Sequence, residues 1–201
     1  GRIYSVEAKW AQAITAYETA LSHWEAAESV LEVKTLTNLG SIYHQFFRED
    51  LALPYYEQAS THELSEETAS ALASTHFQLG LIAQNEKQQA SAVAHYEQAI
   101  AAATEADASQ TLADSHAELG RAYVNAGNLA EGKKNLLSAA TQYAELEKPY
   151  SQAVVLRNLA YLSERKGEWE QSLAYYDQAI AALQADENDH AATLADCYQQ
   201  R

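Results

Sequence analysis

Small and large apolar residues recur along the chain at fixed spacings, with polar residues between them. The stretch 119–139 shows the pattern most clearly. It has Leu-Gly, an aromatic residue three positions on, a Gly-Asn turn, and then small, large and small residues at spacings of four and three. These spacings place the apolar residues on one face of a helix, and Gly-Asn favours a turn. The pattern therefore predicts two helices joined by a tight turn.

The same pattern returns about every 40 residues. We call the position of Gly120 the marker of its unit, because Gly or Ala recurs there at intervals of 39 or 40 residues. Small residues at this position allow paired helices to approach closely. Repetition over the whole length indicates an array of helix pairs rather than one globular core. The five markers are Gly1, Gly40, Gly80, Gly120 and Ala160.

The repeat predicts a single all-α array over residues 1–201. Gly1 and the residues after it match the end of a first helix, and Trp10 matches the start of a second, so the sequence indicates a fragment of a longer protein. We expect a partial first repeat over 1–28, repeats over 29–66, 67–106, 107–148 and 149–187, and the start of a further or capping helix over 188–201. We expect helices near residues 10–27, 30–46, 49–62, 67–85, 88–105, 108–126, 129–146, 150–166, 169–185 and 190–200.

The Leu-Gly pair, the aromatic residue, the Gly-Asn turn and the small-large-small pattern resemble the tetratricopeptide repeat (TPR) family. The unit is longer than the usual one of about 34 residues, and it resembles the long-repeat arrays of cell-polarity scaffolds and of bacterial signalling and transcription regulators. The resemblance implies a right-handed superhelix of antiparallel helix pairs. It also implies a protein–protein interaction scaffold whose concave groove is lined by the first helix of each repeat.

Helical spacing selects the face of each first helix that should line this groove, at positions six, three and two before the marker and one, four and five after it. Of these 24 positions in four complete repeats, four are basic and three acidic, against 13 basic and 28 acidic residues in the whole chain. Seven are Asn or Gln, whose amides can donate to and accept from a peptide backbone. The residues expected to bind a peptide are Lys34, Asn38, Ser41, Gln45, Gln78, Asn85, Arg121, Asn125, Arg157, Asn158, Tyr161 and Arg165.

The expected partner is an extended peptide or a segment of another protein. Arg121, Arg157 and Arg165 lie on successive first helices, which favours an acidic or carboxylate group near the fourth and fifth repeats. The sequence does not reproduce the clamp by which some TPR domains bind C-terminal carboxylates, because Thr37, Phe77 and Ala117 occupy the place of its first Lys. Any helix of an array must also expose a polar face, so an unoccupied, solvated face is an open alternative.

The charge and the cysteine content restrict the partners and the compartment. The net charge of −15 disfavours nucleic acid and anionic membrane surfaces as partners. Cys197 is the only cysteine, which excludes an internal disulfide and fits a reducing, cytoplasmic compartment. The second functional hypothesis is a regulatory or self-assembly module of a larger bacterial signalling or transcription-regulating protein, with a homo-oligomer formed through the ends of the array.

Motifs for catalysis, cofactors or metals are lacking. The sequence has no GxSxG, Walker or dinucleotide-binding motif, so we expect no enzymatic activity and no cofactor. His76 and His116 occupy the same place four residues before the marker, which favours a packing role over metal binding. The acidic stretch Asp186–Asp189 lacks the glycine and the spacing of a calcium loop, and we expect it to be a solvated, capping turn.

Overall fold

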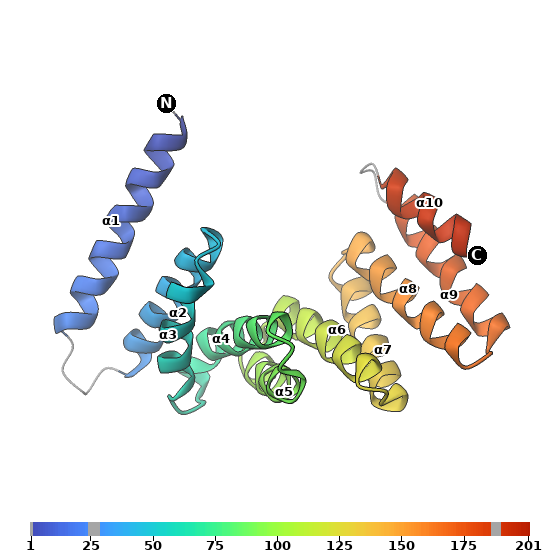
Figure 1. Ribbon diagram of the computed structural model, residues 1–201, viewed down its shortest axis with the longest axis horizontal. Helices are drawn as coiled ribbons and strands as arrows, with labels where there is room; N and C mark the ends of the chain where they lie inside the picture. The colour runs from blue at the N-terminus through green and yellow to red at the C-terminus, as the bar shows by residue number, and fades with distance from the viewer. Residues whose placement is uncertain (1, 24–28, 186–189) are drawn as a thin grey trace.

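The computed structural model describes residues 2–23, 29–185 and 190–201, and within these ranges it contains ten helices and no strand (Figure 1). The expectation of an all-α fold is thus confirmed. The helices are α1 (Arg2–His23), α2 (Ser29–Gln45), α3 (Glu49–Ser60), α4 (Glu66–Asn85), α5 (Gln89–Glu105), α6 (Ser109–Asn125), α7 (Leu129–Glu145), α8 (Pro149–Arg165), α9 (Trp169–Gln184) and α10 (Ala191–Gln200).

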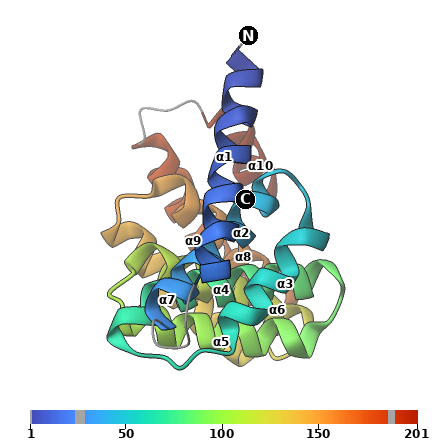
Figure 2. The ribbon, with the colours of Figure 1, turned by 90° about the vertical axis from the view of Figure 1, so that its left-hand side faces the viewer.

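Each helix packs against the helices that precede and follow it in the chain, which makes the molecule an all-α solenoid. The first helices of successive repeats, α2, α4, α6 and α8, also contact one another in order. In Figure 1, α4 lies above α5, on the side toward which both ends of the chain rise, and α6 lies beside α7. Seen from the N-terminal side, α1 stands upright in front of this stack (Figure 2).

The marker glycines allow the second helix of a repeat to pack directly on the backbone of the first. A Cβ atom added at Gly40 would lie 2.6 Å from the ring of Tyr56, and one at Gly80 would lie 2.5 Å from the ring of Tyr96. Both tyrosines have no exposed surface, so their rings cannot swing aside. Glycine is therefore needed at these markers because the opposing aromatic ring fills the space of a side chain.

Most connections between the helices share one turn geometry. The N–H of Arg48, for example, donates to the carbonyl of Tyr43 at 3.0 Å, which is the bond of a Schellman motif. The residue before the donor has a positive φ in each turn of this kind, and these residues lie 20 or 40 positions apart. Each regular repeat therefore consists of two similar halves of about 20 residues, helix plus turn. The left-handed residues are Phe47, Lys87, Asp107, Gly127, Glu147 and Gly167.

The connection between α3 and α4 departs from this geometry. The side chain of Ser65 accepts from the N–H of Thr68 at 3.3 Å, and the N–H of Ser65 donates to the hydroxyl of Thr68 at 2.9 Å. This capping box starts α4 at Glu66. Because α4 begins early, α3 is shortened to 12 residues, against 17 for both α5 and α7.

The prediction for the start of the chain was wrong in one respect, because α1 is one continuous helix without the turn expected before Trp10. Ala8 stands where the regular turns place a left-handed residue, and Ala is the strongest helix former. Gly1, residues 24–27 of the helix expected over 10–27, and the turn expected at Asp186–Asp189 lie outside the described residues.

Two histidines pair inside the third repeat. His76 on α4 is 8% exposed, and its ring stacks on that of His95 on α5, with the two Nδ1 atoms 3.4 Å apart. Burial, and then the neighbouring His95, lower the pKa of His76 from 6.5 to about 4. Burial also lowers the pKa of His95. Both rings are therefore neutral in the folded protein near neutral pH.

We expect the free energy of unfolding to fall as the pH is lowered from about 6.5 toward 4, because the unfolded chain then binds a proton that folded His76 does not. The loss for His76 should approach about 1.4 kcal/mol per pH unit within this window. Urea unfolding at a series of pH values measures it. His76→Leu, which introduces the residue found at the equivalent Leu36 and Leu156, should show a smaller loss. Equal pH dependence in both proteins would contradict this assignment.

Candidate peptide-binding surface

One stripe of side chains along the first helices is open to solvent. It consists of the positions two before, one after and five after each marker, and none of its residues is buried. These positions lie three and four residues apart, so they share one face of each helix. We call them the first-helix stripe: Asn38, Ser41 and Gln45 on α2; Gln78, Leu81 and Asn85 on α4; Glu118, Arg121 and Asn125 on α6; Asn158, Tyr161 and Arg165 on α8.

Ten of the twelve residues expected to bind a peptide belong to this stripe. Of the other two, Lys34 is exposed on α2, six positions before its marker. The sequence did not single out Leu81 and Glu118, although both occupy stripe positions. The signal that could have found them is position alone, because their residue types differ from the amides and cations that the prediction favoured.

Arg157 lies in the contact between repeats rather than in the stripe. Its Nη1 donates to Asp196 on α10 at 2.5 Å. The same position of the second repeat holds Thr37, which is 6% exposed and has its hydroxyl 2.8 Å from that of Thr75 on α4. A residue three positions before the marker therefore faces the next first helix. Arg157 is thus engaged by Asp196, and its role in one anion site with Arg121 stays a prediction.

The stripe is hollowed between α6 and α8. A cavity of about 170 Å³ opens there, and four of its six lining residues were predicted from the sequence. Val124 and Leu136 are buried, which makes its base apolar, whereas the ring of Tyr161 is 54% exposed. We call this cavity the α6–α8 pocket. Its lining residues are Arg121, Val124, Asn125, Leu136, Asn158 and Tyr161.

The polar groups of the α6–α8 pocket keep most of their hydrogen-bonding capacity. Arg121 donates from Nη1 to Glu118 at 2.9 Å, which leaves the other N–H groups of its guanidinium for a ligand. Glu118 also accepts from Gln84 at 3.4 Å. Within the described residues, the side-chain amides of Asn125 and Asn158 make no hydrogen bond. The pocket thus combines a cation, two available amides and an apolar base.

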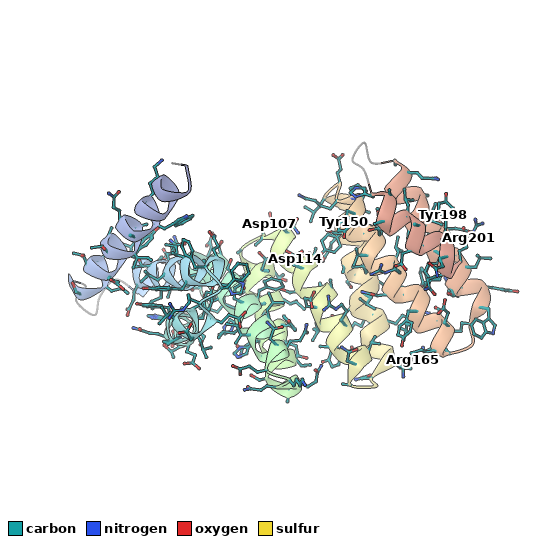
Figure 3. All side chains as sticks on the ribbon, turned by 45° about the horizontal axis from the view of Figure 1, so that its top comes forward. Asp107, Asp114, Tyr150, Arg165, Tyr198 and Arg201 are labelled. Carbon is teal, nitrogen blue, oxygen red and sulfur yellow. The ribbon has the colours of Figure 1, made fainter. Side chains whose placement is uncertain are left out.

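A second acidic residue of α6 is engaged by its own neighbours. Asp114, labelled in Figure 3, accepts from the hydroxyl of Tyr143 at 2.6 Å and from Gln110 at 2.9 Å. Burial and the hydrogen bond to Asp114 raise the pKa of Tyr143, so the phenol stays protonated and keeps donating. Asp114 is held in packing, and the positive charge of Arg121 is opposed mainly by Glu118.

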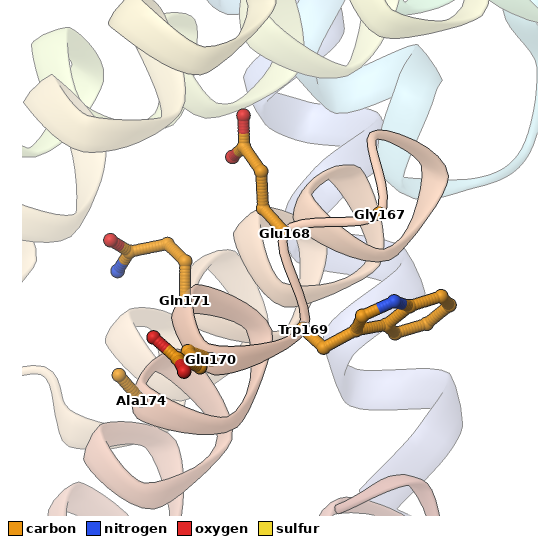
Figure 4. A pocket seen from close by; sticks show the side chains of 6 residues that line it. All are labelled: Gly167, Glu168, Trp169, Glu170, Gln171 and Ala174. Atoms are coloured by element: carbon orange, nitrogen blue, oxygen red, sulfur yellow. The ribbon is translucent and has the colours of Figure 1, made fainter.

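A shallower depression lies at the turn between α8 and α9. It is lined by residues 167–171 and by Ala174, and the indole of Trp169 points away from the side chains of Glu168 and Gln171 (Figure 4). Trp169 is 69% exposed. The equivalent Trp10 packs edge-to-face on Phe46 in the turn of the next repeat, with ring centroids 6.2 Å apart. At Trp10 this position serves packing between repeats. The α6–α8 pocket, which combines a cation with two available amides, is the better candidate for a ligand.

The described residues show no other chemical centre. No group of three or more His, Cys, Asp or Glu among them is arranged to hold a metal ion. None of the described helices combines the length and the apolar character needed to cross a membrane. His116 has its Nδ1 2.9 Å from the side-chain oxygen of Asn135, a contact between the two helices of one repeat.

Comparison with known proteins agrees with this architecture. Three family profiles, each described as tetratricopeptide repeat, match residues 1–62, 73–105 and 155–191. No curated protein matches the chain.

Solved structures of similar fold include BtubC from P. vanneervenii, with a TM-score of 0.71 at 15% identity over 96% of this chain and 82% of that one. The apo form of RapI has a TM-score of 0.74 at 15% identity over 90% of this chain, which spans only 51% of RapI. A putative kinesin light chain protein with TPR-like repeats from Podosopora anserina has a TM-score of 0.60 at 20% identity, over 88% and 89% of the two chains. These likenesses concern the fold alone. Together with the three profile matches, they show that the chain is an array of tetratricopeptide repeats.

Proposed function

We propose that this array binds an extended segment of a partner protein along the first-helix stripe, with an acidic side chain or a terminal carboxylate in the α6–α8 pocket. Tetratricopeptide arrays act in general as protein–protein interaction scaffolds and are typically not enzymes. The observation that carries the finer proposal is the pocket itself, where Arg121, Asn125 and Asn158 converge over an apolar base.

The chemistry of the α6–α8 pocket suits a carboxylate on a short apolar stem. The guanidinium of Arg121 can bind it through charge-assisted hydrogen bonds, which are stronger than neutral ones. The methylene groups of the ligand side chain would lie against Val124 and the ring of Tyr161. The amides of Asn125 and Asn158 can donate to and accept from the main chain of the ligand on either side.

Charge elsewhere on the chain supports selectivity for this one place. The net charge of −15 repels an acidic segment from most of the surface, so the few cations near the pocket direct where it binds. Figure 3 shows Arg165 at the end of α8 opposite Tyr150. It belongs to the stripe, one helical turn beyond Tyr161, and adds an exposed cation on α8 to that of Arg121 on α6.

The test uses peptides selected from a random 12-residue display library against the wild-type protein, with affinity measured by fluorescence anisotropy. We expect the selected peptides to carry an acidic residue and to bind more weakly as salt is added. The double variant Arg121→Ala, Asn158→Ala should weaken binding about tenfold or more, which corresponds to about 1.4 kcal/mol.

Arg48→Ala is the matched control, because Arg48 is an exposed arginine that pairs with Asp50 far from the pocket. It should leave the affinity unchanged. Peptides whose binding ignores both salt and the double variant would exclude the α6–α8 pocket as the site. Sedimentation velocity on the same samples tests the alternative of self-association through the ends of the array.

A further inference from the structure

The first-helix stripe changes from apolar to cationic at one position between the third repeat and the fourth. Position one after the marker is Leu81 on α4 and Arg121 on α6. Leu81 and Phe77 are both partly exposed, and both pack against the buried cluster around Tyr96, so their outer surfaces are held in place. The stripe thus presents an apolar surface on α4 directly before the cationic pocket formed by α6 and α8.

A buried polar atom beside Leu81 lacks a partner. The side-chain oxygen Oε1 of Gln78 is inaccessible to solvent and receives no hydrogen bond from the described residues. A buried acceptor without a donor is unfavourable, and a main-chain N–H is a donor that an extended ligand carries at nearly every residue. Gln78 belongs to the stripe, one helical turn before Leu81. Because the atom has no accessible surface, a ligand N–H can reach it only after the side chain of Gln78 turns outward, and the partly exposed surface of Leu81 carries the extension of the ligand from α6 onto α4.

The distance between Leu81 on α4 and Arg121 on α6 restricts the backbone conformation of a ligand that contacts both. Packed helices lie about 8–10 Å apart, so Leu81 and Arg121 are separated by roughly one such step. A polyproline II segment advances about 3.1 Å per residue with three residues per turn, so every third side chain returns to the same face after about 9 Å. In a β-strand, residues three apart point to opposite faces. A polyproline II segment therefore matches the spacing of the array.

We propose that the partner segment binds in the polyproline II conformation and carries an apolar residue three positions from its acidic residue. The apolar side chain lies on Leu81, a main-chain N–H donates to the side chain of Gln78 once that side chain has turned outward, and the acidic side chain enters the α6–α8 pocket. This inference rests on the proposed function, since it specifies the segment that the same stripe binds.

The experiment compares proline-rich synthetic peptides that carry one Leu and one Glu at separations of two, three and four residues, in both orders along the chain. Anisotropy titrations with the wild-type protein should show binding about fivefold to tenfold tighter at a separation of three than at two or four, in one of the two orders. Leu81→Ser should abolish this preference while Arg121 remains necessary for binding. Leu137→Ser, a change of an exposed leucine on α7, is the matched control and should leave the preference intact.

Two results would separate this inference from the function on which it rests. If Glu peptides bind with dependence on Arg121 but with equal affinity at all separations, or if Leu81→Ser leaves the preference unchanged, the apolar subsite on α4 is refuted and the acidic pocket stands. If binding does not depend on Arg121 at all, the proposed function fails, and the inference fails with it.

Discussion

Gly120→Leu should lower the free energy of unfolding by about 3 kcal/mol or more. A Cβ atom at Gly120 would lie 2.8 Å from Cγ of Leu136 and 3.0 Å from the main-chain nitrogen of the same residue. Leu136 is fully buried, and its backbone belongs to α7, so neither group can move without separating the two helices. The gain in helix propensity over glycine, about 1 kcal/mol, is too small to compensate.

Urea unfolding followed by circular dichroism measures this loss. Asn125→Leu adds the same side chain on the same helix at an exposed position and should change stability by only about 0.5 kcal/mol. A further test combines Gly120→Ala with Leu136→Ala, because removing the opposing side chain should relieve part of the clash and make the two effects non-additive. If Gly120→Leu and Asn125→Leu were equally destabilising, the assignment of packed and exposed faces would be incorrect.

The sequence predicted the helices well wherever a marker and its turn were both present. The helix expected over 129–146 is α7, Leu129–Glu145, because the small residue Gly132 and the large residue Leu136 define its packed face without ambiguity. The error at α1 has a physical cause. Ala8 carries no intrinsic turn preference, whereas Phe47 and Lys87 adopt positive φ only because the packing of two helices imposes the turn. Tertiary packing of this kind is not visible in a single segment of sequence.

At the candidate site, too, the sequence predicted features of single helices but not contacts between them. Helical periodicity correctly placed residues such as Asn125 and Asn158 on an exposed face of their helices. It could not separate Arg157 from them, because a residue three positions before the marker faces the next first helix only when successive repeats stack. The pocket also depends on Leu136 from α7, which no analysis of the first helices alone could include. The exposed face of each helix was thus predictable from its own sequence, whereas cavities and contacts between repeats could be seen only once the stacking of the repeats was known.

Leu159→Ala should lower the free energy of unfolding by about 2 to 5 kcal/mol, and its effect should be confined to one part of the array. Leu159 has no exposed surface and belongs to a buried cluster that spans α6 to α10. Two further clusters, around Leu72 and Tyr56, draw their buried residues only from α2 to α5. Because each repeat contacts mainly its neighbours, the array can open locally at the damaged cluster.

Hydrogen exchange should therefore show lost amide protection in α8 and α9 of Leu159→Ala, with protection in α4 and α5 retained. Leu173→Ala is the matched control, since Leu173 is 42% exposed on α9 and its truncation should change stability by only about 0.5 kcal/mol. Uniform loss of protection along the whole chain would contradict the separation into clusters. Local opening would also weaken ligand binding at the α6–α8 pocket, although Leu159 does not line the pocket. The apparent affinity should fall in proportion to the fraction of molecules in which α8 remains folded. Unlike Arg121→Ala, this loss should disappear at low temperature, where the folded form of the variant predominates.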